Sequence, residues 1–165
     1  MNEVLKTATT FAIASSLLLV SVPSETHAVT KPYYSYNGYV KNNSKFLIDK
    51  DFVRALKYDN FIMNGYKLNL KGRNGYGTKD FMKYDTYYYK DAKNRVTMIR
   101  PIVSHDKTIT LKQFLAAHKN NKLIHKGKGP KVGVYDLHYR TNGADYFASF
   151  YKGYLIYFEY GVYAS

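Results

Sequence analysis

The sequence VGVYDLHYRTNGADYFASFYKGYLIYFEYGV, at residues 132–162, predicts a run of antiparallel strands. Asn142-Gly143 is the strongest hairpin signal in the chain, and Lys152-Gly153 is a weaker second turn. Aromatic and β-branched residues, which favour strands, fill the segments around these turns. We therefore expect an antiparallel meander with strands at about 132–140, 145–151 and 154–162.

Two-residue turns at these positions also predict the strand register, with Arg140 facing Asp145 and Phe150 facing Leu155. Side chains alternate between the two faces of a sheet. One face then carries Tyr135, Leu137, Tyr139, Tyr146, Ala148, Phe150, Leu155 and Tyr157. The other carries Asp136, His138, Arg140, Phe147, Ser149, Tyr151, Ile156, Phe158 and Tyr160. We expect helices to pack on the first face, because it has fewer charges.

Two helices are expected before the meander. Asp49 can cap a helix whose apolar face includes Phe52 and Leu56. Thr110 and Gln113 have the spacing of a capping box, and the helix that follows should run to about Asn120. A basic, glycine-containing loop at residues 126–131 should then lead into the meander.

Further strands are expected at residues 81–90 and 95–103, around a turn at 91–94. Because Pro101 cannot donate to a sheet ladder, the second of these strands should be an edge strand or end early. The fold class is therefore α+β, with a single domain, one antiparallel sheet and two helices packed on one face. The order of the elements also fits two helix-then-strands units.

The first 28 residues resemble a secretory signal. An apolar, uncharged run at 8–22 precedes Thr26 and Ala28, which supply small residues for cleavage after Ala28. The alternative is a retained membrane anchor, but this run is shorter than the roughly 20 residues that a spanning helix needs. We expect residues 29–165 to form one exported domain, with 29–45 as an extended lead-in. The expected localisation is secreted, with loose association with the cell surface as a further option.

Positive charge and tyrosine dominate the composition. The 165 residues include 25 Lys and Arg against 12 Asp and Glu, and 19 Tyr but no Trp or Cys. Without residues 1–28, 24 basic and 10 acidic residues remain, a net charge of +14. Folding does not need this charge, because self-repulsion opposes compactness. A polyanion with flat rings, such as nucleic acid, is the partner that it favours.

The charge concentrates in the second expected helix and the loop after it, since residues 105–131 hold seven Lys and one Asp. We expect a phosphate backbone to follow this zone. The expected contacts are Lys112, Lys119, Lys122, Lys126, Lys128 and Lys131, with Lys71, Arg73 and Arg140 as secondary contacts. The alternative for any single lysine is a solvated surface that keeps the protein soluble.

Most of the tyrosines are explained by β-propensity, because Tyr suits a half-buried pleated surface. Tyr151, Tyr154 and Tyr160 are the candidates for stacking on bases, provided that their sheet face is open. His118 lies on the apolar face of the second helix, and we expect it to be half-buried.

The sequence offers little for catalysis. The histidines at 105, 118, 125 and 138 lack metal-binding spacing, and no thiolate is present to complete a zinc site. Beyond residue 28, Glu159 is the single glutamate, so paired carboxylates for acid–base chemistry are restricted to scattered aspartates. We expect a protein that is not an enzyme and that uses no metal and no cofactor.

One stretch resembles a known family. Residues 32–40 (PYYSYNGYV) and 46–50 (FLIDK) are followed by 57–60 (KYDN) and 64–68 (NGYKL), and together they are similar to the immunodominant staphylococcal antigen B family. The resemblance implies a secreted or loosely surface-associated protein that binds extracellular nucleic acid without strong sequence preference, in connection with biofilm matrix and host interaction. It implies no catalytic or base-reading residues.

Two functions remain open at this point. The first is non-enzymatic, sequence-independent binding of extracellular DNA or RNA through the phosphate backbone. The alternative is a module that binds a host protein, or an anionic glycan or cell-wall polymer, with the charge serving retention on an anionic wall.

Overall fold

The structure, a computed structural model, describes residues 33–72, 79–103 and 107–163. The expected signal at residues 1–28 lies outside this part of the chain. The helical elements are η1 (Ser44–Ile48), α1 (Lys50–Lys57) and α2 (Leu111–Ala117). The strands are β1 (Tyr34–Tyr36), β2 (Phe61–Met63), β3 (Tyr66–Lys67), β4 (Lys79–Lys83), β5 (Thr86–Lys90), β6 (Val96–Pro101), β7 (Lys122–Lys128), β8 (Val134–Arg140), β9 (Asp145–Tyr151) and β10 (Tyr154–Gly161).

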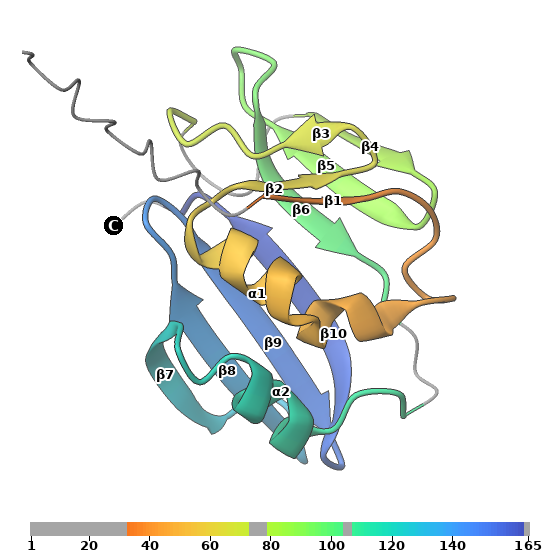
Figure 1. Ribbon diagram of the computed structural model, residues 1–165, viewed down its shortest axis with the longest axis vertical. Helices are drawn as coiled ribbons and strands as arrows, with labels where there is room; N and C mark the ends of the chain where they lie inside the picture. Colours follow the sequence, from red (N-terminus) through yellow and green to blue (C-terminus); the bar gives the residue numbers. More distant parts are fainter. Residues whose placement is uncertain (1–32, 73–78, 104–106, 164–165) are drawn as a thin grey trace, which may run out of the picture.

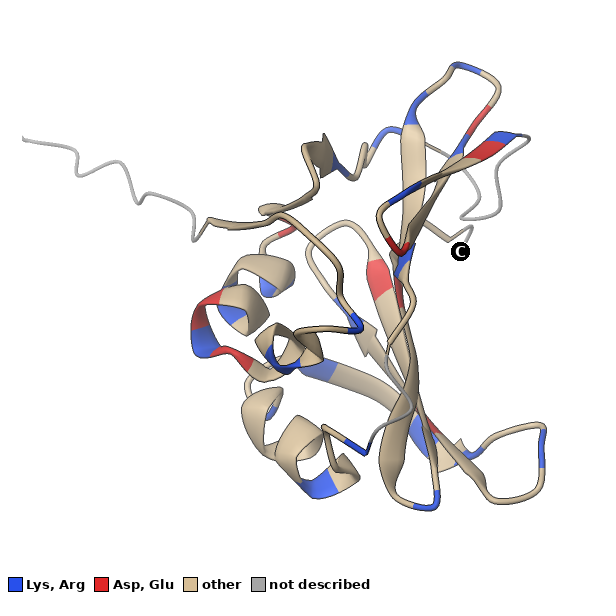
Figure 2. Cartoon of the chain, turned by 90° about the vertical axis from the view of Figure 1, so that its right-hand side faces the viewer, with Lys and Arg blue, Asp and Glu red and all other residues tan. Residues whose placement is uncertain are grey.

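A seven-stranded antiparallel sheet forms the centre of the fold, in the order β4-β5-β6-β10-β9-β8-β7 (Figure 1). Helices α1 and α2 lie on the same face of this sheet (Figure 2). We call this the helix face, and the opposite face, over which no helix of the described residues lies, the open face. The expected α+β class with two helices on one face is confirmed.

A second, three-stranded sheet covers a part of the helix face that α1 and α2 do not cover. In it, β1 pairs with β2 in parallel and β2 pairs with β3 in antiparallel fashion. The Tyr88 hydroxyl of β5 donates to the Met63 carbonyl of β2 at 3.0 Å, and the Tyr66 ring lies 4.7 Å from the Tyr88 ring. The expectation of a single sheet was therefore wrong, because the described residues form two sheets. The expectation of an extended lead-in was also wrong, because β1 and η1 form within residues 34–48.

The register expected for the meander is confirmed between β8 and β9, where Arg140 pairs with Asp145 and Tyr139 with Tyr146. Between β9 and β10 the expected register was only partly right. Leu155 pairs with Phe150, but a β-bulge follows, and Phe158 then pairs with Ala148. Because one extra residue exchanges the two faces of a strand, Phe158 and Tyr160 point to the helix face, while Tyr157 and Glu159 point to the open face.

Other differences arise where local signals were weak. Residues 79–90 form a hairpin rather than one strand, and its turn contains Tyr84 with φ 54°, a conformation unusual for an aromatic residue. Strand β6 is internal to the sheet, between β5 and β10, so it is not an edge strand, but it ends early, at Pro101, which was the other expected outcome. The expectation of a basic loop at 126–131 was wrong for the first half of that range, because residues 122–128 form β7. Pairing with β8 outweighs the low β-propensity of Lys and Gly.

Both expected helix caps are present. The Asp49 side chain accepts hydrogen bonds from the backbone amides of Asp51 and Phe52. Thr110 and Gln113 form the reciprocal capping box. Helix α2 is shorter than expected, since it ends at Ala117 and His118 is its C-cap.

His118 is fully buried rather than half-buried, and it joins the end of α2 to η1 and β9. Its Nδ1 lies 2.8 Å from the Tyr146 hydroxyl of β9, and its Nε2 lies 3.0 Å from the Leu47 carbonyl of η1. The Asn121 amide donates to the Tyr146 hydroxyl at 2.9 Å and to the Val53 carbonyl of α1 at 3.3 Å. These contacts fit a neutral ring that donates from Nε2 and accepts at Nδ1.

Burial lowers the pKa of His118 from 6.5 to about 3. Below pH 6.5 the unfolded chain therefore binds a proton that the folded chain does not. We predict that this residue makes the free energy of unfolding fall by about 1.4 kcal/mol per pH unit on acidification through this range. Urea unfolding of the wild type and of His118→Gln between pH 7.5 and 5 measures the difference in slope. An imidazole NMR signal of His118 that titrates near pH 6 in the folded protein would contradict the assignment.

Candidate nucleic-acid interface

Strand β7 places three lysines at an edge of the large sheet. Within the described chain it pairs only with β8, and most of its side chains are exposed. Lys126 pairs with Leu137 and Lys128 with Tyr135, so both lysines project toward the helix face. Lys122 pairs with Arg140 and projects toward the open face.

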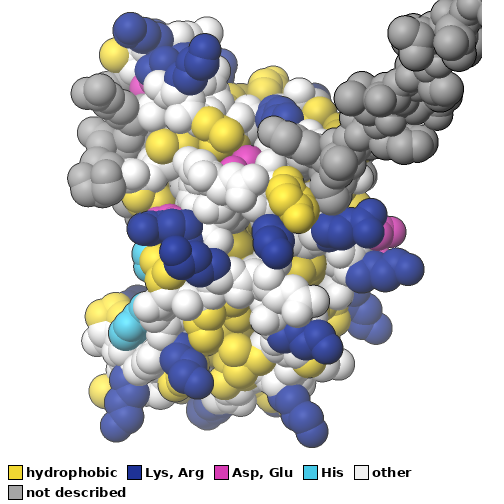
Figure 3. All heavy atoms as spheres, turned by 60° about the vertical axis from the view of Figure 1, so that its left-hand side comes forward, with side chains coloured by type: hydrophobic (Ala, Val, Ile, Leu, Met, Phe, Trp, Pro, Cys, Tyr) yellow, Lys and Arg dark blue, Asp and Glu magenta, His cyan; other side chains and the backbone are white. Residues whose placement is uncertain are grey.

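Helix α2 adds further charge on the helix face. Lys112 on α2 and Lys119 just after it are exposed. Leu115 of α2, Leu123 of β7 and Tyr135 of β8 add partly exposed apolar side chains to these elements. Figure 3 shows hydrophobic side chains in the lower half of this side of the molecule, with Lys and Arg side chains around them. The surface can therefore offer cations and apolar contact area together.

A groove of about 400 Å³ extends this basic surface between α1 and the end of α2. Three cationic side chains of α1 line it, Lys50, Arg54 and Lys57, together with the Asp51 carboxylate and the amide side chains of Asn120 and Asn121. Cations at i, i+4 and i+7 lie on one face of a helix. These α1 residues were not among the expected contacts, although their spacing was visible in the sequence.

The remaining expected cations are dispersed. Lys131 is exposed in the turn between β7 and β8. Lys71 is exposed beside a separate hollow that Tyr58 and Lys67 also line. Arg73 lies outside the described residues. The structure therefore brings the lysines of α2 and β7 together, but it does not bring Lys71 to them.

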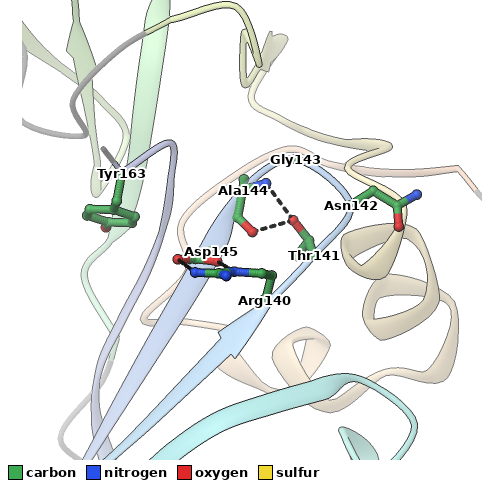
Figure 4. A pocket seen from close by; sticks show the side chains of 7 residues that line it. All are labelled: Arg140, Thr141, Asn142, Gly143, Ala144, Asp145 and Tyr163. Carbon is green, nitrogen blue, oxygen red and sulfur yellow. Dashed lines mark hydrogen bonds and ion pairs between the residues drawn. The ribbon is translucent and has the colours of Figure 1, made fainter. Parts of the chain in front are cut away.

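Arg140 is less available for a phosphate than expected. It lies at the end of β8, beside a pocket of about 230 Å³ at the β8–β9 turn (Figure 4). Its Nε donates to Asp145 at 3.0 Å, and this interaction raises the pKa of the Arg140 guanidinium. His138 Nε2 also lies 3.0 Å from Asp145. Because this carboxylate already offsets its charge, Arg140 is a weaker anion contact than the lysines of β7.

The structure separates the three tyrosine candidates for stacking. Tyr151 is 43% exposed, and Tyr154 is half-buried with Lys107 Nζ 5.7 Å from its ring centre. The expectation for Tyr160 was wrong, because the β-bulge turns its side chain into the core and leaves it 1% exposed. Tyr151 pairs with Tyr154 on the open face, so these rings and the cations Lys126 and Lys128 lie on opposite sides of the sheet.

Neither a metal site nor a membrane-spanning helix occurs in the part of the chain that the structure describes. No group of three or more His, Asp or Glu side chains there is placed to hold a metal ion. In the same part of the chain, no helix has the length and apolar character needed to cross a membrane.

Comparison with known proteins agrees with the sequence resemblance. The family model of immunodominant staphylococcal antigen B matches residues 33–159. The chain belongs to this family. Relatives named immunodominant staphylococcal antigen B, from Staphylococcus aureus strains USA300, NCTC 8325 / PS 47 and COL, are 36% identical to it over 106 residues. The match covers 63% of this chain and 57% of the length of each relative.

A comparison with solved structures found no match. Membership of a staphylococcal antigen family is consistent with extracellular exposure. The family match extends well beyond the N-terminal stretch that carried the resemblance, and it includes α2, β7 and the meander almost to its end.

Replacing Tyr160 tests its reassignment from surface to core. The Tyr160 hydroxyl donates to the buried Asp59 carboxylate at 3.0 Å. We predict that Tyr160→Phe lowers the free energy of unfolding by about 1–3 kcal/mol, because Asp59 loses a donor. Urea unfolding measures this change, and a mobility-shift assay should show DNA affinity within about twofold of the wild type. Lost affinity without lost stability would restore Tyr160 as a surface contact.

Proposed function

We propose that this protein is a secreted, non-enzymatic protein that binds extracellular nucleic acid without strong sequence preference. The observation that carries the proposal is the collection of exposed lysines from α2 and β7 around an apolar surface, with the basic groove of α1 beside it. The family resemblance implies the same function. A role in the biofilm matrix or in virulence belongs to this proposal.

The proposed mechanism is neutralisation of phosphates. Lys112, Lys119, Lys126 and Lys128 contact the backbone, and the counterions that they displace are released. Such contacts position a nucleic acid but do not read its sequence, because every nucleotide presents the same phosphate. Leu123 and Tyr135 supply apolar surface against which sugars or exposed bases can rest.

Salt dependence is the first test. If roughly five phosphates are engaged, the logarithm of the association constant for duplex DNA should fall with the logarithm of salt concentration at a slope of about −4 to −5. Mobility shifts across a salt series measure the slope, with heparin and teichoic acid as competitors. A flat salt response would exclude the mechanism. If heparin and teichoic acid compete as strongly as unlabelled DNA does, the anionic-glycan alternative is favoured.

Paired charge variants test the location of the site. We predict that Lys126→Gln with Lys128→Gln reduces the magnitude of the slope by about 2 and weakens binding roughly 30-fold at 0.15 M salt, to a similar extent for all sequences. The matched control is Lys79→Gln with Lys93→Gln, which removes the same charge from exposed positions on β4 and the β5–β6 turn. Equal weakening by both variants would mean that net charge alone, and not this surface, determines affinity.

A further inference from the structure

The open face of the sheet contains a groove that the proposed nucleic-acid surface does not include. Its volume is about 340 Å³, which is sufficient for a small ring-shaped ligand. The groove lies across β7, β8, β9 and β10. Its lining residues are His125, Asp136, Leu137, His138, Phe147, Ser149, Tyr157, Glu159 and Tyr163.

Aromatic rings form much of the groove wall. The His138 and Phe147 rings stack at 3.9 Å between centres with an angle of 20° between their planes. The Tyr163 ring meets Phe147 edge-on at 5.0 Å and 83°. Each ring contact fixes a side chain on the surface of the sheet, so the wall is preformed. The faces of such rings carry partial negative charge and favour contact with the C–H groups of a ligand.

The two carboxylates of the groove differ in their hydrogen bonds. Glu159 is buried and accepts from the hydroxyls of Tyr157 and Tyr163. Asp136 Oδ1 is buried and has no hydrogen-bond partner among the described residues. A buried acceptor without a partner costs free energy in the ligand-free protein. A donor from a ligand in the groove would remove that cost.

The charges near the groove favour a neutral ligand. Arg100 lies 4.0 Å from Glu159, and Arg140 is paired with Asp145, whereas Asp136 forms no ion pair among the described residues. An anion would be repelled by Asp136 at close range. A small cation would be opposed by Arg100, Arg140 and the net positive field of the protein. A neutral ligand with hydroxyl donors avoids both costs.

We propose that this groove binds one ring of a neutral carbohydrate. The C–H face of the sugar packs on the exposed parts of the Phe147 and Tyr157 rings, and one hydroxyl donates to Asp136 Oδ1. Ser149 and His125 supply further polar contacts at the edge. The site does not depend on the proposed nucleic-acid function, because Lys126 and Lys128 project from the other side of the sheet. The two ligands can therefore bind at the same time.

The test begins with the exported chain, residues 29–165, on an array of neutral and anionic glycans. The neutral glycan with the strongest signal is then titrated by calorimetry. We expect Asp136→Leu, which keeps the side-chain shape but removes the acceptor, to weaken glycan binding at least tenfold. Phe147→Leu should weaken it similarly. The matched control is Tyr151→Leu, an exposed aromatic residue on the same strand and face but outside the groove, and it should leave binding within twofold.

Measurements of stability and DNA binding distinguish a ligand-binding role of Asp136 from a structural one. Asp136→Leu should unfold at the same or higher urea concentration than the wild type, because a buried unpartnered acceptor is removed, and its DNA affinity should not fall. The proposal would be overturned if no neutral glycan gave a stronger array signal with the wild type than with Asp136→Leu. Binding of guanosine or adenosine with the same sensitivity to Asp136→Leu, in place of a neutral glycan, would assign the groove to nucleobases and also overturn it.

Discussion

The buried hydrogen bonds of His118 hold the helical elements against the large sheet. The ring joins the end of α2 to Leu47 in η1 and to Tyr146 in β9, and Asn121 extends the connection to Val53 in α1. Polar groups buried this deeply are favourable only when each has a partner, so the network permits few alternative placements of the helices. It therefore fixes the side of the sheet on which the lysines of α2 and the cations of α1 lie.

The β-bulge after Leu155 determines how the aromatic residues are divided. It turns Phe158 and Tyr160 into the core and leaves Tyr157 and Glu159 on the open face. Without it the alternation of β10 would place a buried carboxylate where Tyr160 now bonds to Asp59. The extra residue thus places Phe158 and Tyr160 in the core, and it also puts Tyr157 and Glu159 in the wall of the open-face groove.

Local signals in the sequence were sufficient for much of the fold. The caps at Asp49 and Thr110, and the hairpin at Asn142-Gly143, depend on residues close in sequence, and all three are present. The bulge in β10 and strand β7 depend on how each strand pairs with its neighbour, β9 and β8, which propensity does not encode. The concentration of lysines around α2 and β7 was visible in the composition along the chain, and the pairing of Arg140 with Asp145 followed from the expected hairpin register. The burial of Tyr160 could not be predicted, because it depends on the bulge.

In the proposed function, nucleic acid binds the helix face, through α2, β7 and the groove of α1, and the open face is left to another ligand. The most direct test is NMR chemical-shift mapping of the exported chain with a short DNA duplex. We predict shifts that concentrate on residues 112–128 and on α1, with little change at Phe147, Tyr157 and Tyr163. Shifts concentrated on the open face, or spread evenly over all surface lysines, would contradict it.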